Sequence, residues 1–152
     1  MKILISQQEY IKTPRNFVFD ALERAYYNFL SGHELIVAPN INKVAHNDYD
    51  CLVLTGGPDS VARNKTENLL YADAIIKGKP IIGICHGAFA INDICKGKNG
   101  HVEGHVDADI KITMEGQEHV VKCYHSQSIE KLAEDFVTIA FDGQGTIEAF
   151  KH

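Results

Sequence analysis

A cysteine between two glycines carries the clearest chemical signal in this 152-residue chain. Gly83, Cys85 and Gly87 form a Gly-x-Cys-x-Gly pattern that follows an apolar run at residues 81–84 and precedes a predicted helix at about residues 86–95. A turn of this kind is sharp and strained, so larger side chains two residues to either side would clash with the strand or the helix. The turn raises the thiol at the carboxyl end of the strand, and the positive end of the helix favours the thiolate. The pattern therefore predicts that Cys85 is a nucleophile.

A second glycine pair follows the predicted strand at residues 51–54. Gly56 and Gly57 stand directly before Pro58, and paired glycines let backbone N–H groups approach a ligand closely. This loop should lie beside Cys85 at the same edge of the sheet. The N–H groups of Gly57 and His86 are then placed to form an oxyanion hole for a tetrahedral intermediate.

The elements that must position these groups alternate along the chain. Short apolar runs at residues 3–5, 35–38, 51–54 and 81–84 read as buried strands. Helical patterns separate them: one opens at Pro14 and places Val18, Leu22 and Tyr26 at helical spacing, and another is capped by Asp59 or Ser60. This order predicts a parallel sheet covered on both faces. Residues 100–124 and 136–150 predict an antiparallel extension, with a short helix near residues 129–134. We expect a single domain over residues 1–152.

Composition excludes several classes of function. The chain has 15 basic and 20 acidic residues, a formal charge of -5 and no basic stripe, so no nucleic-acid partner is expected. No apolar run approaches the roughly 18–20 residues of a membrane span, so no membrane partner is expected. The N-terminus becomes polar too soon for a signal peptide, which predicts a cytoplasmic protein with reduced thiols. No dinucleotide or P-loop motif occurs, and no cofactor is expected.

Two further groups of polar residues fit ordinary surface positions better than functional sites. His101, Glu103 and His105 alternate, so on a strand they would share one face and offer zinc ligands. A plain polar strand face is favoured, and no metal is assigned to the site. Arg63, Lys65 and Glu67 open the helix after the glycine loop and could reach the distal part of a substrate, but a solvated helix face is the favoured interpretation.

Together the two glycine motifs and Tyr124-His125-Ser126, in this order, resemble class I glutamine amidotransferases. The opening residues MKILISQ and residues 102–106 and 147–149 are most similar to the γ-glutamyl-amide hydrolase branch of that family. The resemblance covers nearly the whole chain. It implies a three-layer αβα sandwich of the flavodoxin-like type with a mainly parallel sheet.

The resemblance also implies a reaction. Cys85 would attack the γ-carbonyl of glutamine or another small γ-glutamyl amide and form a thioester, which water then hydrolyses. Residues around the oxyanion and the γ-glutamyl group would be Gly56, Gly57, His86, Tyr124, Ser126 and Gln127. If ammonia is the useful product, a synthase partner is implied, and a homo-oligomer is the other partner considered.

This chain departs from the family pattern at two places. No His-Pro-Glu motif, the usual source of the base and its orienting acid, occurs in the 152 residues, and Phe89 stands where glutamine is usual. The favoured replacement is His125 as base with Glu148 orienting it; His86 and a residue from a partner subunit are the alternatives. Two other functions stay open: a catalytically impaired binding or regulatory subunit, and a thiol hydrolase or oxidation sensor that resembles the PfpI family and uses Cys85 and His86.

Overall fold

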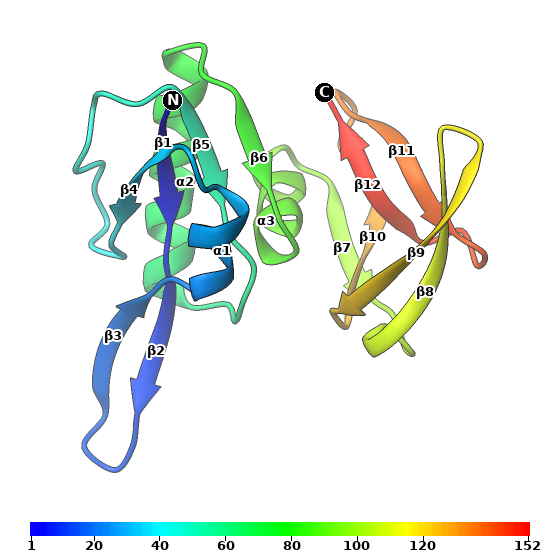
Figure 1. The fold of residues 1–152 in the computed structure, drawn as a ribbon, viewed down its shortest axis with the longest axis horizontal. Helices are drawn as coiled ribbons and strands as arrows, with labels where there is room; N and C mark the ends of the chain where they lie inside the picture. The colour runs from blue at the N-terminus through cyan, green and yellow to red at the C-terminus, as the bar shows by residue number, and fades with distance from the viewer. The chain divides into compact units, whose positions relative to one another are not determined.

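The structure, a computed structural model, describes residues 1–152 and divides into two compact units, Met1–Ala90 and Ile91–His152 (Figure 1). That residues 1–152 form a single domain stays a prediction.

A four-stranded parallel sheet organises the first unit. Its strands, in spatial order, are β4 (Glu34–Ala38), β1 (Lys2–Ser6), β5 (Cys51–Leu54) and β6 (Ile81–Gly83). The helices are α1 (Arg24–Phe29), α2 (Val61–Ile76) and α3 (His86–Ile94). The Ser60 side chain caps α2 by accepting a hydrogen bond from the Arg63 N–H, as the sequence predicts. None of the helices combines the length and apolarity that crossing a bilayer demands.

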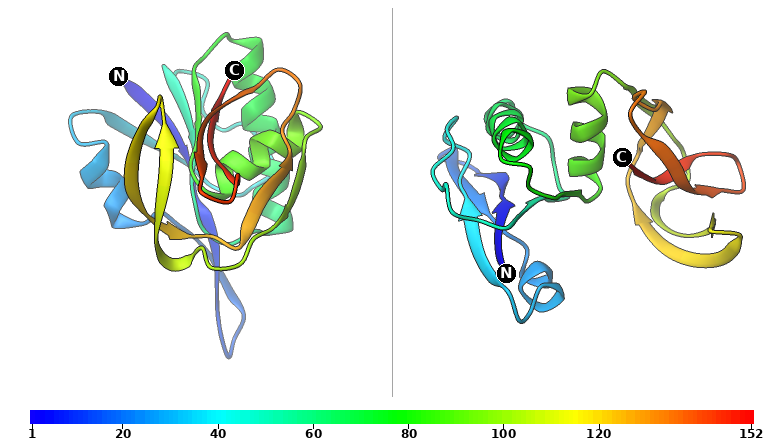
Figure 2. Two further views of the ribbon diagram at one scale, coloured as in Figure 1. Left: turned by 90° about the vertical axis from the view of Figure 1, so that its right-hand side faces the viewer. Right: turned by 90° about the horizontal axis from the view of Figure 1, so that it is seen from above.

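Side chains that alternate along the strands bury both faces of this sheet. One face carries the cluster Ile3, Ile5, Cys51 and Val53, and Tyr26 and Leu30 pack against it from the α1 side. Strand residues of the opposite parity, such as Leu4 and Leu52, are fully buried on the other face, and α2 lies against β5 and buries Leu70. The view from above shows α1 and α2 on opposite sides of the strands (Figure 2). This confirms the predicted α/β class with helices on both faces of a parallel sheet.

The predicted helix that opens at Pro14 is wrong over most of its length. Residues 8–21 form an antiparallel hairpin of β2 (Gln8–Lys12) and β3 (Phe17–Ala21), and only α1 is helical. Asn16 adopts φ +53 in the turn, a conformation that ends any right-handed helix. The run Phe17-Val18-Phe19 is rich in aromatic and β-branched side chains that favour a strand, and Tyr10 pairs with Phe19 across the hairpin.

The second unit is antiparallel throughout. One pair joins β7 (Lys98–His101) to β10 (Gln127–Lys131), and a four-stranded sheet has the order β12 (Ile147–Lys151), β11 (Val137–Asp142), β8 (Val106–Met114) and β9 (Gln117–Tyr124). The predicted antiparallel extension is therefore confirmed.

The short helix predicted near residues 129–134 is wrong, because β10 runs through its first half. The fully buried Asn92 side chain explains why no helix follows: its amide donates to the Lys131 carbonyl, and its Oδ1 accepts from the Ala133 N–H. These backbone groups would otherwise be available for helical hydrogen bonds. A side chain distant in sequence thus decides the local structure.

Candidate active site

Cys85 occupies the turn between β6 and the first residue of α3. Its backbone has φ +51, in the left-handed region that costs a non-glycine residue about 1–3 kcal/mol. Its side chain is exposed, in contrast to the buried thiols of Cys51 and Cys123. A strained backbone that presents a thiol to solvent is the geometry of a nucleophile elbow.

The two flanking glycines are required by contacts with the backbone. A Cβ on Gly83 would lie 2.7 Å from the Ala88 nitrogen, and a Cβ on Gly87 would lie 2.2 Å from the Leu54 carbonyl oxygen. Both neighbours are main-chain atoms that cannot rotate away. The steric reason for the Gly-x-Cys-x-Gly pattern is confirmed by this geometry.

Replacement of Gly87 by alanine is therefore expected to destabilise the protein by about 1–3 kcal/mol, the usual penalty for overpacking a filled interior. Urea unfolding measures the free energy. Gly143→Ala is the matched control, because a Cβ at Gly143 meets nothing within 4 Å. Equal unfolding free energies for the two variants would contradict the steric argument.

The glycine loop after β5 lies next to Cys85. A Cβ on Gly56 would lie 3.3 Å from the Cys85 Cβ and 3.5 Å from the Tyr26 hydroxyl oxygen, and the Gly56 N–H donates to that oxygen at 2.9 Å. Burial raises the pKa of Tyr26, so its hydroxyl stays protonated. The loop and cap hydrogen bonds of this unit use the N–H groups of Gly56 and Gly87 but not those of Gly57 and His86. The N–H groups of Gly57 and His86, which are predicted to form the oxyanion hole, are therefore not used by these hydrogen bonds.

Arg63 ties this loop to α2 from inside the protein. Its side chain is fully buried, so its interpretation as part of a solvated helix face is wrong. The guanidinium donates to the Pro58 carbonyl at 2.9 Å and to both the carbonyl and the hydroxyl oxygen of Thr55. Both ends of the glycine loop are thus held by one cation. Sequence periodicity gave no signal for this role, because the partners lie outside the helix.

Glu67 is the buried counter-ion of Arg63 and a partner of His86. Its Oε1 lies 2.9 Å from the Arg63 Nε and accepts from the Ser6 hydroxyl at 2.7 Å, while its Oε2 lies 3.0 Å from the His86 Nε2. Burial alone would raise the pKa of Glu67. The hydrogen bonds from His86, Ser6 and Arg63 and the Arg63 charge outweigh burial, so the pKa of Glu67 is lowered. The imidazole of His86, which follows Cys85 in the chain, is therefore oriented by an ionised carboxylate.

The second unit brings the other predicted residues together. The His125 Nδ1 donates to the Gln127 carbonyl at 2.8 Å, and its Nε2 lies 3.3 Å from the Glu148 Oε2. The hydrogen bond to Glu148 raises the pKa of His125, although burial opposes it. Tyr124 and Ser126 flank His125 with exposed side chains. The Cys123 thiol lies 3.9 Å from the same Glu148 oxygen.

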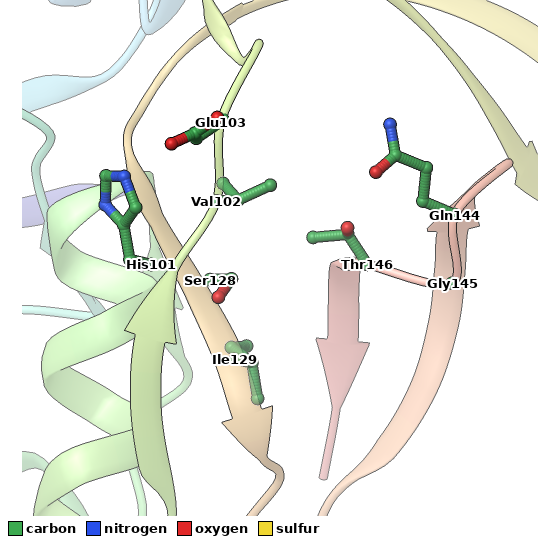
Figure 3. Close-up of a pocket in the computed structure, with 8 residues that line it drawn as sticks. All are labelled: His101, Val102, Glu103, Ser128, Ile129, Gln144, Gly145 and Thr146. Carbon is green, nitrogen blue, oxygen red and sulfur yellow. The ribbon is translucent and has the colours of Figure 1, made fainter.

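An open pocket of about 370 Å³ also lies in the second unit. His101 and Glu103 stand on one side of it and Gln144 and Thr146 on the other (Figure 3). None of the predicted site residues lines this pocket.

His101 and His105 do not share a strand face as expected. Strand β7 ends at His101, β8 begins at Val106, and His105 is buried between them.

These observations define an α/β protein with a nucleophile-elbow cysteine beside a double-glycine loop. The chain belongs to the class I glutamine amidotransferase family: the family model described as glutamine amidotransferase class-I matches residues 21–152. The resemblance stated from the motifs is confirmed.

Individual relatives agree with the family assignment. The γ-glutamyl-CDP-amidate hydrolase of Campylobacter jejuni is 28% identical over 110 residues, which cover 66% of this chain and 54% of that protein. This chain thus spans about half the length of that relative. A glutamine amidotransferase structure from Thermotoga maritima superposes with a TM-score of 0.75 at 12% identity, covering 99% of this chain and 71% of that chain. A glutamine amidotransferase structure from Methylobacillus flagellatus gives a TM-score of 0.73 at 17% identity, covering 98% of this chain and 64% of that chain.

Proposed function

We propose that the protein hydrolyses glutamine or another γ-glutamyl amide through a thioester on Cys85. The observation that carries the proposal is the exposed Cys85 thiol, held at φ +51 between two glycines that admit no side chain. Membership of the class I glutamine amidotransferase family supports the same chemistry.

In the proposed reaction the Cys85 sulfur attacks the γ-carbonyl carbon. Negative charge develops on the carbonyl oxygen, and the N–H groups of Gly57 and His86 stabilise it. The base accepts the proton of the Cys85 thiol and passes it to the amide nitrogen, and the tetrahedral intermediate collapses with release of ammonia or an amine, which leaves a γ-glutamyl thioester. Water then adds to the thioester carbonyl, and glutamate leaves as the thiol is restored.

Two features favour a γ-glutamyl amide other than glutamine. Phe89, buried in the first turn of α3, replaces the glutamine usual in the family at this position. The name of the Campylobacter relative includes a γ-glutamyl amidate. The exposed segment of Tyr124, Ser126 and Gln127 is proposed to contact the γ-glutamyl group. If ammonia is the useful product, a synthase subunit is the proposed partner.

For the base, we propose His125 with Glu148 as its orienting acid. Glu148 faces the Nε2 of His125, so the nitrogen left for proton transfer is Nδ1, which donates to the Gln127 carbonyl at 2.8 Å. Proton transfer at Nδ1 requires that this hydrogen bond break when substrate binds. His86 is the second candidate, because the buried Glu67 orients it at 3.0 Å and it follows the nucleophile directly.

Substitution of each histidine by glutamine separates the two candidates. We expect His125→Gln to lower kcat for glutamate release by about 10²–10⁴-fold, the usual contribution of a general base. His86→Gln should retain most of the rate, because glutamine can still donate to Glu67. The exposed His119→Gln is the control. A larger loss in His86→Gln than in His125→Gln, with both variants folded by circular dichroism, would assign the base to His86.

A further inference from the structure

Two histidines and a glutamate of the second unit converge on one point. His105 precedes β8, His125 follows β9, and Glu148 lies in β12. One nitrogen or oxygen from each of the three residues lies within 4.8 Å of the others. The two imidazole rings are 5.1 Å apart between centroids.

Polar atoms at this point lack protein partners. The His105 side chain is 1% exposed, yet neither of its ring nitrogens makes a hydrogen bond. The Glu148 Oε1, on a side chain 8% exposed, makes none either and lies 3.8 Å from the His105 Nδ1. A buried polar group without a partner costs about 1–3 kcal/mol, and native structures tolerate few of them. A cation held between the His105 Nδ1 and the Glu148 Oε1 would give both of these atoms a partner.

A carbonyl or carboxylate oxygen lies behind each of the two imidazoles. The His125 Nδ1 donates to the Gln127 carbonyl at 2.8 Å, which turns its Nε2 toward Glu148. The Asp142 Oδ2 lies 3.2 Å from the His105 Nε2, without the geometry of a hydrogen bond, and the Asp142 Oδ1 accepts from the backbone of Gln144 and Thr146. Metal-ligating histidines are held in this way, with a carbonyl or carboxylate behind the ring.

The separations match the size of a zinc site. Zn–N bonds of about 2.0–2.1 Å place two tetrahedral ligand atoms about 3.4 Å apart. The contacts of Glu148 with His125 and His105 are 3.3 and 3.8 Å. Two imidazole ligands disfavour Ca²⁺ and Mg²⁺, which prefer oxygen ligands, and favour zinc and similar transition metals.

From this geometry we infer a binding site for a divalent transition-metal ion of the zinc type, with His105 Nδ1, His125 Nε2 and the Glu148 carboxylate as ligands. The inference concerns binding and stands apart from the proposed hydrolysis. A metal ion on His125 and a base role of His125 exclude each other, so metal loading would withdraw this imidazole from catalysis.

The test is a titration of the metal-stripped 152-residue protein with Zn²⁺ in competition with a chromogenic chelator. We expect one Zn²⁺ per chain and a rise in the melting temperature on binding. His105→Gln, His125→Gln and Glu148→Gln should each weaken the affinity by at least 100-fold. Asp142→Asn leaves the ligands in place and should weaken it by about 10–100-fold, the usual effect of losing an orienting group.

Matched variants exclude other sources of metal binding. His119→Gln removes an exposed histidine of the same unit, and Cys85→Ala removes the exposed thiol. Both should bind Zn²⁺ as the wild type does. If a ligand variant fails to fold, Co²⁺ loading of the wild type gives a second measurement, since tetrahedral nitrogen and oxygen ligation produces intense visible d–d bands. Absence of stoichiometric binding in the wild type, or affinity unchanged in all three ligand variants, would overturn the inference.

Discussion

Cys85→Ala is expected to abolish glutamate release, with a loss in kcat of roughly 10³-fold or more, because no other group can form the thioester. A γ-glutamyl diazo-ketone gives an independent measurement. It should add its mass to the wild type and leave Cys85→Ala unmodified. The variant should keep the wild-type fold, since the removed thiol belongs to an exposed residue.

Cys95→Ala is the matched control for this prediction. Cys95 lies just beyond α3 and is half-buried, and its removal should leave both glutamate release and the diazo-ketone adduct intact. Release that survives in Cys85→Ala would refute the thioester mechanism. No adduct and no release by the wild type, across glutamine and a panel of γ-glutamyl amides, would instead favour the non-catalytic binding subunit. Retained ligand binding by Cys85→Ala in calorimetry would then support that function.

The elbow could be predicted because most of its determinants are close together in the sequence. An apolar strand, two glycines and a helix lie within residues 81–94, and the clashes that require the glycines involve atoms at residues 54, 87 and 88. The parallel sheet could also be predicted, since the apolar runs of β1, β4, β5 and β6 are separated by segments long enough for crossover connections, although residues 8–21 form a hairpin and not the expected helix. Structure can be predicted from sequence patterns where the interacting residues are mostly close together in the chain.

The buried ion pair of α2 could not be predicted in this way. Arg63 and Glu67 have the spacing of an exposed i,i+4 pair, which is the common interpretation of such a pattern. Their partners Ser6 and Thr55 come from the ends of two other strands and are visible only in the folded unit. The same holds for His105, His125 and Glu148, which belong to three separate segments of the second unit. Alternation along the sequence places His105 on the same face as His101, but the chain leaves the strand between β7 and β8 and separates them.

Arg63→Met is expected to have the largest effect on stability of any variant considered, about 3–5 kcal/mol, because it leaves a buried carboxylate without its cation. Methionine fills much of the volume, so the loss measures the charge and the hydrogen bonds rather than a cavity. Urea unfolding at neutral pH gives the value. Lys65→Met, an exposed position of the same helix, should change the unfolding free energy by less than about 0.5 kcal/mol.

The double variant Arg63→Met/Glu67→Gln tests the cause, since removal of the orphaned charge should recover part of the stability lost in Arg63→Met alone.

The pH dependence of the unfolding free energy gives a second test. The folded-state pKa of Glu67 is lowered, so its contribution is present above the unfolded pKa of about 4.3 and is lost as the pH falls through the folded value. Without the Arg63 charge and hydrogen bond, burial of the carboxylate is less well compensated, and the pKa of Glu67 rises. The stability difference between wild type and Arg63→Met should therefore begin to narrow above the unfolded pKa of about 4.3, where Glu67 of the variant becomes protonated. It should narrow further as the pH falls through the lowered pKa of wild-type Glu67, because protonated Glu67 no longer needs the guanidinium. A difference that stays constant with pH would mean that Arg63 stabilises the fold only through its bonds to Thr55 and Pro58, which do not titrate.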